Sequence, residues 1–229
     1  MESIADNIAR LRERIHNRAV KVGRKSEEIS LVAVTKTVDS NRIIQAREAG
    51  ITAFGENYVQ EAREKIPHIG EGASWHMIGR LQTNKVKYVV PLFSMIHSVD
   101  SARLAGEISE QAIKHEKIMD ILIQVNLGRE NAKSGVTQED LPQLLGVASA
   151  LPGITVKGLM AMPPYFSDPE KVRPFFRTLR ELRDKNFPFY SGSLFLAHLS
   201  MGMSSDFEVA IDEGATILRI GTAIFGERK

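Results

Sequence analysis

The sequence predicts an α/β protein: a single (β/α)8 barrel of the TIM type, preceded by an N-terminal helix, with residues 1–229 forming one domain. Short apolar, β-branched runs recur eight times after Ser30, and helical stretches separate them. Strands that alternate with helices form a parallel sheet, and eight repeats favour a closed barrel over an open doubly wound sheet. Several runs are apolar at nearly every position, as expected for strands that are buried on both faces.

An amphipathic helix is predicted at the N-terminus. Its apolar residues recur at helical spacing before Gly23, a common helix terminator: Ile4, Ile8, Leu11, Ile15, Ala19 and Val22. Arg10, Arg14 and Arg18 lie on another face of the same helix. Such a stripe could bind an anion, but this pattern is more often a solvated helix face. We therefore predict a solvated face.

The predicted strands are, in chain order, Leu31–Val34, Thr52–Phe54, Trp75–Ile78, Phe93–Ile96, Ile121–Val125, Val156–Met160, Leu194–Leu199 and Ile217–Ile220. Capping residues support the helices between them: Asp39 or Ser40 before a helix that Gly50 ends, Thr137 with Asp140, and Ser205 with Glu208 before a helix that Gly214 ends. The helix that carries Pro174 must begin late or bend, because proline disrupts a helix interior.

Composition argues against several classes of protein. The 30 basic and 28 acidic residues nearly balance, at +2, so neither nucleic acid nor an anionic membrane is suggested as a partner. Cysteine is absent, and the six histidines show no ligand spacing such as His-x-x-x-His, so no metal site is predicted. No apolar run approaches the roughly 20 residues of a membrane span, and no signal peptide is evident. We expect a cytoplasmic protein.

Lys36 is the leading functional candidate. It follows Leu31–Val34 and Thr35 without a turn residue, so we expect it to continue the strand, on the same face as Val34. Barrels of this kind place their chemistry at the carboxyl ends of the strands. Burial there lowers the pKa of a lysine, and a neutral amine forms an imine with an aldehyde. The alternative is a salt bridge between Lys36 and Glu56.

The last two predicted strands end in segments suited to an anion. Ser200, Met201 and Gly202 follow the seventh strand, and Gly221 and Thr222 follow the eighth. Glycine lets the backbone approach an anion, and the loops after strands seven and eight are the recurrent phosphate site of this fold. In a closed ring, these loops lie beside the first strand and therefore beside Lys36. The loops and the lysine together predict a site for a phosphorylated aldehyde.

Pyridoxal 5′-phosphate (PLP) is such an aldehyde, carried on a pyridine ring. Arg219 lies in the last predicted strand, and its guanidinium keeps its proton at physiological pH. If Arg219 donates to the pyridine nitrogen, that nitrogen stays unprotonated and PLP becomes a weaker electron sink. This suits racemase-like proton exchange or simple carriage of the cofactor, and it argues against transamination. The alternative is an arginine–carboxylate pair across the barrel mouth.

These residues lie in motifs that resemble those of the PLP-binding homeostasis family (the YggS or PROSC proteins), whose fold is similar to the N-terminal barrel of bacterial alanine racemase. The resemblance runs from about Leu31 to Arg228 and rests on AVTK (33–36), FGENYVQE (54–61), WHMIGRLQTNK (75–85), KSG (133–135), LSMGMSSDF (199–207) and RIGTAIFG (219–226). Met77 stands where phenylalanine is frequent, outside the expected site.

The resemblance implies a role for each matched position. Lys36 would hold PLP as a Schiff base, with Val34 and Asn57 beside the cofactor, Arg219 at the pyridine nitrogen, and the phosphate held by Ser200, the backbone near Met201, Gly221 and Thr222. The family is associated with PLP buffering and delivery, and with vitamin B6 and amino-acid balance. Apo forms of PLP-dependent enzymes are the expected recipients, and we expect a monomer.

Two other functions remain open. A PLP-dependent amino-acid racemase needs a second acid–base group on the other face of the ring, for which Tyr58 and His198 are the candidates. The other possible function is non-covalent binding of a phosphorylated metabolite by the barrel. His76 is expected to be a hydrogen-bonded structural residue, and Lys133 a solvated loop lysine rather than a second amine for PLP transfer.

Overall fold

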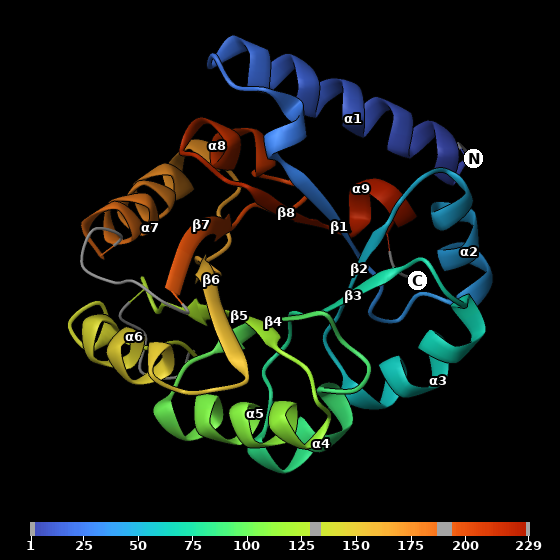
Figure 1. Ribbon diagram of the computed structural model, residues 1–229. Helices are drawn as coiled ribbons and strands as arrows, with labels where there is room; N and C mark the ends of the chain where they lie inside the picture. Colours follow the sequence, from blue (N-terminus) through green and yellow to red (C-terminus); the bar gives the residue numbers. More distant parts are fainter. Residues whose placement is uncertain (1–2, 129–133, 187–193, 228–229) are drawn as a thin grey trace.

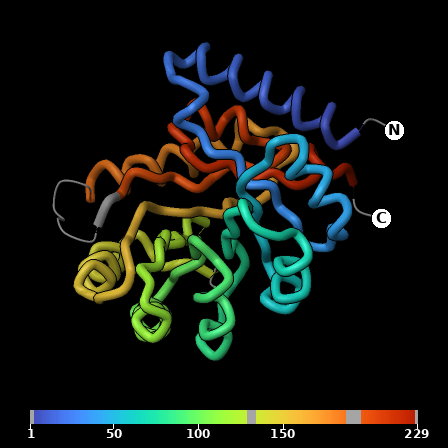
Figure 2. The backbone as a smooth tube through the Cα atoms, turned by 45° about the vertical axis from the view of Figure 1, so that its right-hand side comes forward, coloured from blue at the N-terminus to red at the C-terminus, as the bar shows by residue number. Residues whose placement is uncertain are grey.

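The chain forms a closed barrel of eight parallel strands in the order β1 to β8, with β1 paired to β8, which confirms the predicted fold class. The structure is a computed structural model and describes residues 3–128, 134–186 and 194–227. Figure 1 shows the helices as an outer ring around the strands, with α1 covering the side where β1 meets β8. The tube in Figure 2 shows the same layering, with both ends of the chain on one side of the molecule.

The strands are β1 (Ser30–Val34), β2 (Ala53–Glu56), β3 (Ser74–Met77), β4 (Met95–Val99), β5 (Met119–Gln124), β6 (Ile154–Met160), β7 (Leu194–Ser200) and β8 (Ile217–Ile220). The helices are α1 (Ile4–Lys21), α2 (Ser40–Glu48), α3 (Val59–Ile69), α4 (Val86–Val89), α5 (Ala102–Lys114), α6 (Leu141–Ser149), α7 (Arg173–Asn186), α8 (Phe207–Asp212) and α9 (Thr222–Phe225). Within the described residues no helix is long and apolar enough to cross a membrane.

Two strands extend past their predicted ends into polar residues. β4 was predicted to end at Ile96 but continues through His97 and Ser98, which are both buried. β2 likewise includes Glu56, which is fully buried. The prediction stopped at these residues because a buried polar side chain is costly without a partner, and sequence alone does not reveal the partner.

The predicted helix boundaries hold in part. The Asp39 carboxylate accepts a hydrogen bond from the backbone N–H of Arg42 and caps α2, as expected. α7 begins at Arg173, which leaves Pro174 in the first turn, where proline is tolerated. The Ser205–Glu208 capping box is wrong, because α8 begins after Asp206, whose carboxylate instead accepts from the Met203 N–H at 2.6 Å.

The arginine stripe of α1 is only in part the solvated face that the sequence predicted: Arg10 and Arg14 are exposed, whereas Arg18 is half-buried. Arg18 forms a bidentate ion pair with Asp212 of α8, and Arg14 pairs with Glu208 at 2.9 Å while lying over the ring of Phe207. These contacts fasten α1 to the barrel in addition to its apolar face. The error arises because charge spacing along one helix does not reveal the acidic residues of another.

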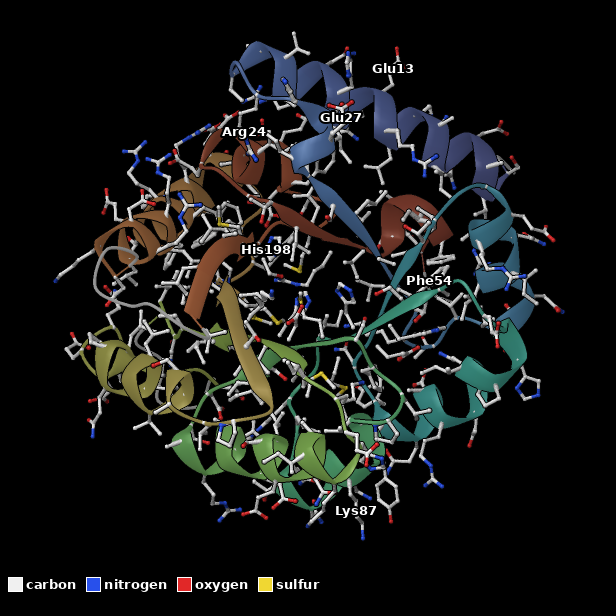
Figure 3. All side chains as sticks on the ribbon, viewed as in Figure 1. Glu13, Arg24, Glu27, Phe54, Lys87 and His198 are labelled. Carbon is white, nitrogen blue, oxygen red and sulfur yellow. The ribbon has the colours of Figure 1, made fainter. Side chains whose placement is uncertain are left out.

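The centre of the barrel is filled by side chains that point inward from the strands. Figure 3 shows sticks throughout the middle of the ring, whereas Glu13 and Lys87 lie on its outer rim. One layer of this interior is apolar and contains Val32, Met95, Leu122, Met160 and Ile217. The remaining inward positions are largely polar, which is the feature that defines the site below.

Candidate functional site

Lys36 lies directly after the first strand, at the carboxyl end of the barrel. The Thr35 N–H still bonds the Gly55 carbonyl at 2.9 Å, but Lys36 itself is in a turn, and Thr37 has a φ of 60°. The expectation that Lys36 continues the strand is therefore wrong by two residues. Its side chain is half-buried, and Val34 behind it is buried. The lysine is thus held by a turn at the mouth, anchored by the last bond of the β1–β2 ladder.

Glu56 fixes that turn from the outer face of the sheet. Its Oε1 atom accepts from the Thr35 hydroxyl at 2.7 Å and from the Lys65 ammonium at 2.9 Å, while Oε2 accepts from the Asn57 N–H at 3.2 Å. Lys65 also donates to the Thr35 carbonyl at 2.7 Å. The carboxylate proposed as a salt-bridge partner of Lys36 is therefore bound by Lys65 on the side that faces α3.

Arg219 points into the barrel from β8 and is almost completely buried. It donates to the Ser200 hydroxyl at 2.6 Å and to the Ala161 carbonyl at 2.9 Å. Burial lowers the pKa of Arg219 to about 10, which leaves the guanidinium charged at neutral pH. Both of these partners are neutral, so the arginine–carboxylate pair considered from the sequence does not form among the described residues.

Two histidines continue the polar interior from Ser200. His97 Nδ1 lies 2.9 Å from Ser200 Oγ, and His97 Nε2 lies 3.0 Å from His76 Nδ1. His76 Nε2 lies 3.1 Å from the Ser74 hydroxyl. His76 is thus a hydrogen-bonded interior residue, as predicted. His97 was missed, because the predicted strand stopped one residue before it.

The loops after β7 and β8 carry backbone donors that are not used within the fold. The N–H groups of Ser204, Ser205 and Thr222 have no acceptor among the described residues. Gly202, at φ +93°, lets the loop pack on α8, since a Cβ there would lie 2.6 Å from the Cβ of Ala210. Unpaired N–H groups grouped in this way attract an anion.

The predicted phosphate residues are therefore only partly suited to an anion. Gly221 and Thr222 lie at the loop, as expected, but the Met201 N–H is bound to the Ile217 carbonyl at 3.1 Å. The Ser200 hydroxyl is fully buried between Arg219 and His97. The missed donors are Ser204 and Ser205, which the sequence had offered only as part of a motif.

Asn57 lies at the carboxyl end of β2 and lines a cavity of about 280 Å³ with Ile78, Gln124 and Met162. A Cβ at Gly79 would lie 2.3 Å from the Asn57 carbonyl, so glycine is required for this approach. Asn57 also lines a neighbouring cavity of about 320 Å³. The barrel mouth next to Asn57 is thus open to a small molecule.

The candidates for a second acid–base group lie apart from one another. Tyr58 is exposed beside Asn57. His198, which Figure 3 labels beside β7, has its Nδ1 atom 3.3 Å from the hydroxyl of Thr216, the residue that precedes β8. It therefore lies toward the amino ends of the strands, away from the mouth, which argues against it as a catalytic group. Lys133 lies outside the described residues.

The fold and the site define a (β/α)8 barrel with a lysine after its first strand, a buried arginine in its last and unpaired N–H groups in its last two loops. The family model described as "Alanine racemase, N-terminal domain" matches residues 1–229. A curated relative from Aquifex aeolicus, named pyridoxal phosphate homeostasis protein, is 47% identical over 225 residues, which cover 98% of each chain. The chain belongs to the alanine racemase N-terminal domain family, within its group of pyridoxal phosphate homeostasis proteins.

Solved structures agree with this assignment. PipY of Synechococcus elongatus, in a structure with PLP bound, is 33% identical, with a TM-score of 0.84 and coverage of 98% of this chain and 100% of that one. Alanine racemase from Corynebacterium glutamicum, at 17% identity and a TM-score of 0.66, shares the fold, and the match covers 62% of that chain.

Proposed function

We propose that this protein binds PLP as a Schiff base on Lys36 and acts in PLP (vitamin B6) homeostasis and amino-acid balance, as a carrier or buffer of the cofactor. The observation that carries the proposal is the convergence, at one end of the barrel, of an amine, a buried cation and unpaired N–H groups, contributed by β1, β8 and the last two loops. The relative from Aquifex aeolicus that is named for pyridoxal phosphate, and the PLP-bound structure of PipY, support the same cofactor.

Each element of the site has a chemical role. When bound, PLP would supply an aldehyde, and Lys36 would be the amine that holds it. The turn anchored by Glu56 holds Lys36 at the mouth. Arg219 would donate to the ring nitrogen, and the unpaired N–H groups of Ser204, Ser205 and Thr222 would hold the phosphate. Val34, which is buried, and Asn57, which lines a cavity at the end of β2, would lie next to the cofactor.

For Ser200 we propose a role other than the expected one. The Ser200 oxygen accepts from Arg219 at 2.6 Å, and His97 Nδ1 lies 2.9 Å from the same hydroxyl. We therefore assign Ser200 to the support of Arg219 rather than to the phosphate. The hydroxyls of Ser204 and Thr222 take the phosphate role, beside the glycine of the eighth loop, Gly221.

Carriage rather than turnover follows from the groups near the mouth. Racemisation requires acid–base groups on both faces of the ring, and His198 lies toward the opposite end of the barrel. Tyr58, the other candidate, is exposed beside Asn57, and carriage of an aldehyde by Lys36 requires no second acid–base group. Apo forms of PLP-dependent enzymes are the proposed recipients, and the proposed carrier is a monomer.

The test is mass spectrometry of the purified protein, incubated with PLP and then treated with borohydride. Borohydride converts the imine to a stable amine, so one pyridoxyl group should remain on the peptide that contains Lys36. Lys36→Ala should remove the label, and Lys21→Ala, at an exposed position on α1, should retain it. A wild-type protein that stays unlabelled overturns the proposal.

A second measurement separates a carrier from an enzyme. Amino acids are incubated with the holo-protein in deuterated water, and deuterium at Cα is measured by NMR. A carrier should incorporate deuterium no faster than free PLP does. Incorporation that is faster and is lost in Lys36→Ala would identify a racemase-like enzyme instead.

A further inference from the structure

A continuous chain of polar groups crosses the interior of the barrel. It begins at Arg219 near the carboxyl end of the strands and passes through Ser200 and His97 to His76. It continues to the hydroxyls of Ser74 and Ser94, which are 2.6 Å apart, and ends at the carbonyl of Trp75. Ser74 begins β3 and Ser94 directly precedes β4, so this end lies at the amino ends of the strands.

The arginine end of the chain fixes the direction of every hydrogen bond. Guanidinium only donates, so Ser200 Oγ accepts from Arg219. The Ser200 hydroxyl hydrogen must then find an acceptor, and His97 Nδ1 is its remaining partner among the described residues. A neutral imidazole has one donor and one acceptor nitrogen. His97 therefore donates from Nε2 to His76 Nδ1, and His76 donates from Nε2 to Ser74.

The contacts at the opposite end accommodate the same direction. A carbonyl only accepts, and the Ser94 hydroxyl donates to the Trp75 carbonyl at 3.0 Å. Ser94 Oγ is therefore the acceptor for the Ser74 hydroxyl, whose oxygen in turn accepts from His76. The direction set by Arg219 thus gives the Nε2–H tautomer at both histidines, and the contacts at the serine end are all satisfied by it.

Both histidines are held uncharged by their surroundings. Burial lowers the pKa of His76 to about 4 and lowers that of His97 well below its usual value, with His76 and Arg219 adding repulsion at His97. A proton on His97 Nδ1 would also point at the Ser200 hydroxyl and leave that hydroxyl's hydrogen without an acceptor. The neutral state is therefore the one in which the whole chain is satisfied.

We infer that His97 is a positioning residue for Arg219: by accepting the Ser200 proton it turns the Ser200 lone pairs toward the guanidinium and holds that cation where a pyridine nitrogen is recognised. The inference rests on the proposed function of the site. His76 supports His97 by fixing its tautomer. Arg219 needs such support because its other acceptor, the Ala161 carbonyl, holds only one nitrogen.

The first test compares two replacements of His97. In His97→Gln the amide oxygen accepts from Ser200 and the amide nitrogen donates to His76, which preserves the direction of the chain. In His97→Leu the Ser200 proton loses its acceptor. By the usual cost of an unmade buried hydrogen bond, PLP should bind about tenfold more weakly to His97→Leu, as measured by titration of visible absorbance. His97→Gln should stay within about threefold of the wild type.

A matched control uses the same strand. Met95 also points into the barrel from β4, two residues before His97, within the apolar layer. Met95→Leu changes the shape of the interior without touching the polar chain, and it should leave the PLP affinity within about threefold of wild type, as volume-conserving changes usually do. Equal losses in Met95→Leu and His97→Leu would overturn the positioning role.

A PLP analogue in which a C–H group replaces the ring nitrogen separates positioning from general damage. If His97 acts through Arg219 on that nitrogen, His97→Leu should weaken PLP but leave the affinity for the analogue close to that of wild type. An equal loss for both ligands would show that His97 supports only the fold, and it would overturn the inference.

The tautomers provide a test that needs no ligand. Two-dimensional ¹H–¹⁵N NMR of the wild-type protein at neutral pH should show Nε2 protonated and Nδ1 unprotonated at both His76 and His97. A proton on Nδ1 of either ring would refute the chain. Failure of PLP to label Lys36 would instead refute the proposed function and leave the tautomer result standing, so the two failures are distinguishable.

Discussion

Replacement of Glu56 should be the most damaging single change near Lys36. The carboxylate is fully buried and accepts from the Thr35 hydroxyl, the Lys65 ammonium and the Asn57 N–H. Glu56→Ala removes all three bonds and leaves a largely buried ammonium without this partner. Breaking a buried ion pair from one side typically costs about 3–5 kcal/mol, of which part is retained here because Lys65 still binds Glu61 at 2.6 Å.

We therefore expect Glu56→Ala to lower the free energy of unfolding by about 3 kcal/mol. For a chain of this length that corresponds to a decrease in melting temperature of roughly 6–12 °C. Glu56→Gln keeps an acceptor for Thr35 but loses the charge opposite Lys65, so about half of that loss is expected. Urea unfolding followed by circular dichroism measures all of these values.

The control is Glu64→Ala, which removes an exposed carboxylate from α3 and should change stability by less than about 0.5 kcal/mol. The same variants should be tested for borohydride labelling, because Thr35 precedes Lys36 directly. A loss below about 1 kcal/mol in Glu56→Ala would refute the reasoning that this carboxylate anchors the lysine turn.

Three further predictions concern other parts of the barrel. Gly202→Ala should lower the free energy of unfolding by about 2 kcal/mol or more and weaken PLP binding, because alanine is strained at φ +93° and its Cβ would lie 2.6 Å from that of Ala210. The control is Gly146→Ala in α6, where a Cβ meets nothing within 4 Å, and it should be neutral or stabilising. Equal effects of the two substitutions would contradict this account. His76 has a pKa of about 4 in the folded state against about 6.5 in the unfolded state, so the unfolded state binds more protons between these pH values. The free energy of unfolding should therefore fall as the pH drops from 6.5 toward 4. In acid unfolding curves, His76→Gln should show a shallower decrease. Arg18→Met should lower the free energy of unfolding by about 1 kcal/mol, as measured in urea, because it releases α1 from α8. Arg14→Met should lower it less, because the ion pair of Arg14 is more exposed. The reverse order would refute the role assigned to the Arg18–Asp212 pair.

Local patterns were sufficient to predict the architecture. Eight β-branched runs with intervening helices specify a parallel barrel, because the period of the apolar residues and the order of the elements are both properties of the chain itself. The position of Lys36 after the first run and of Arg219 in the last follows from the same reasoning. The sequence also predicted that both would lie at the end where such barrels carry their sites.

Pairings between distant polar residues could not be predicted. Glu56 binds Lys65, Arg18 binds Asp212, and each partner lies on a different element. A predicted strand that stopped at Ile96 concealed His97, because an isolated buried histidine appears unfavourable until Ser200, 103 residues later, is placed beside it. Such bonds depend on distance in space, for which separation along the chain carries no information.

The sequence by itself determined the barrel, the lysine at its mouth and the glycine-containing loops after the last two strands, since these follow from periodicity, turn chemistry and the order of the elements. Only the tertiary structure decided that Ser200 supports Arg219 within a one-directional hydrogen-bond chain. The physical reason is that a hydroxyl has one hydrogen. Which acceptor receives it is settled by the groups that the closed barrel brings within 3 Å, and those groups come from β3, β4, β7 and β8.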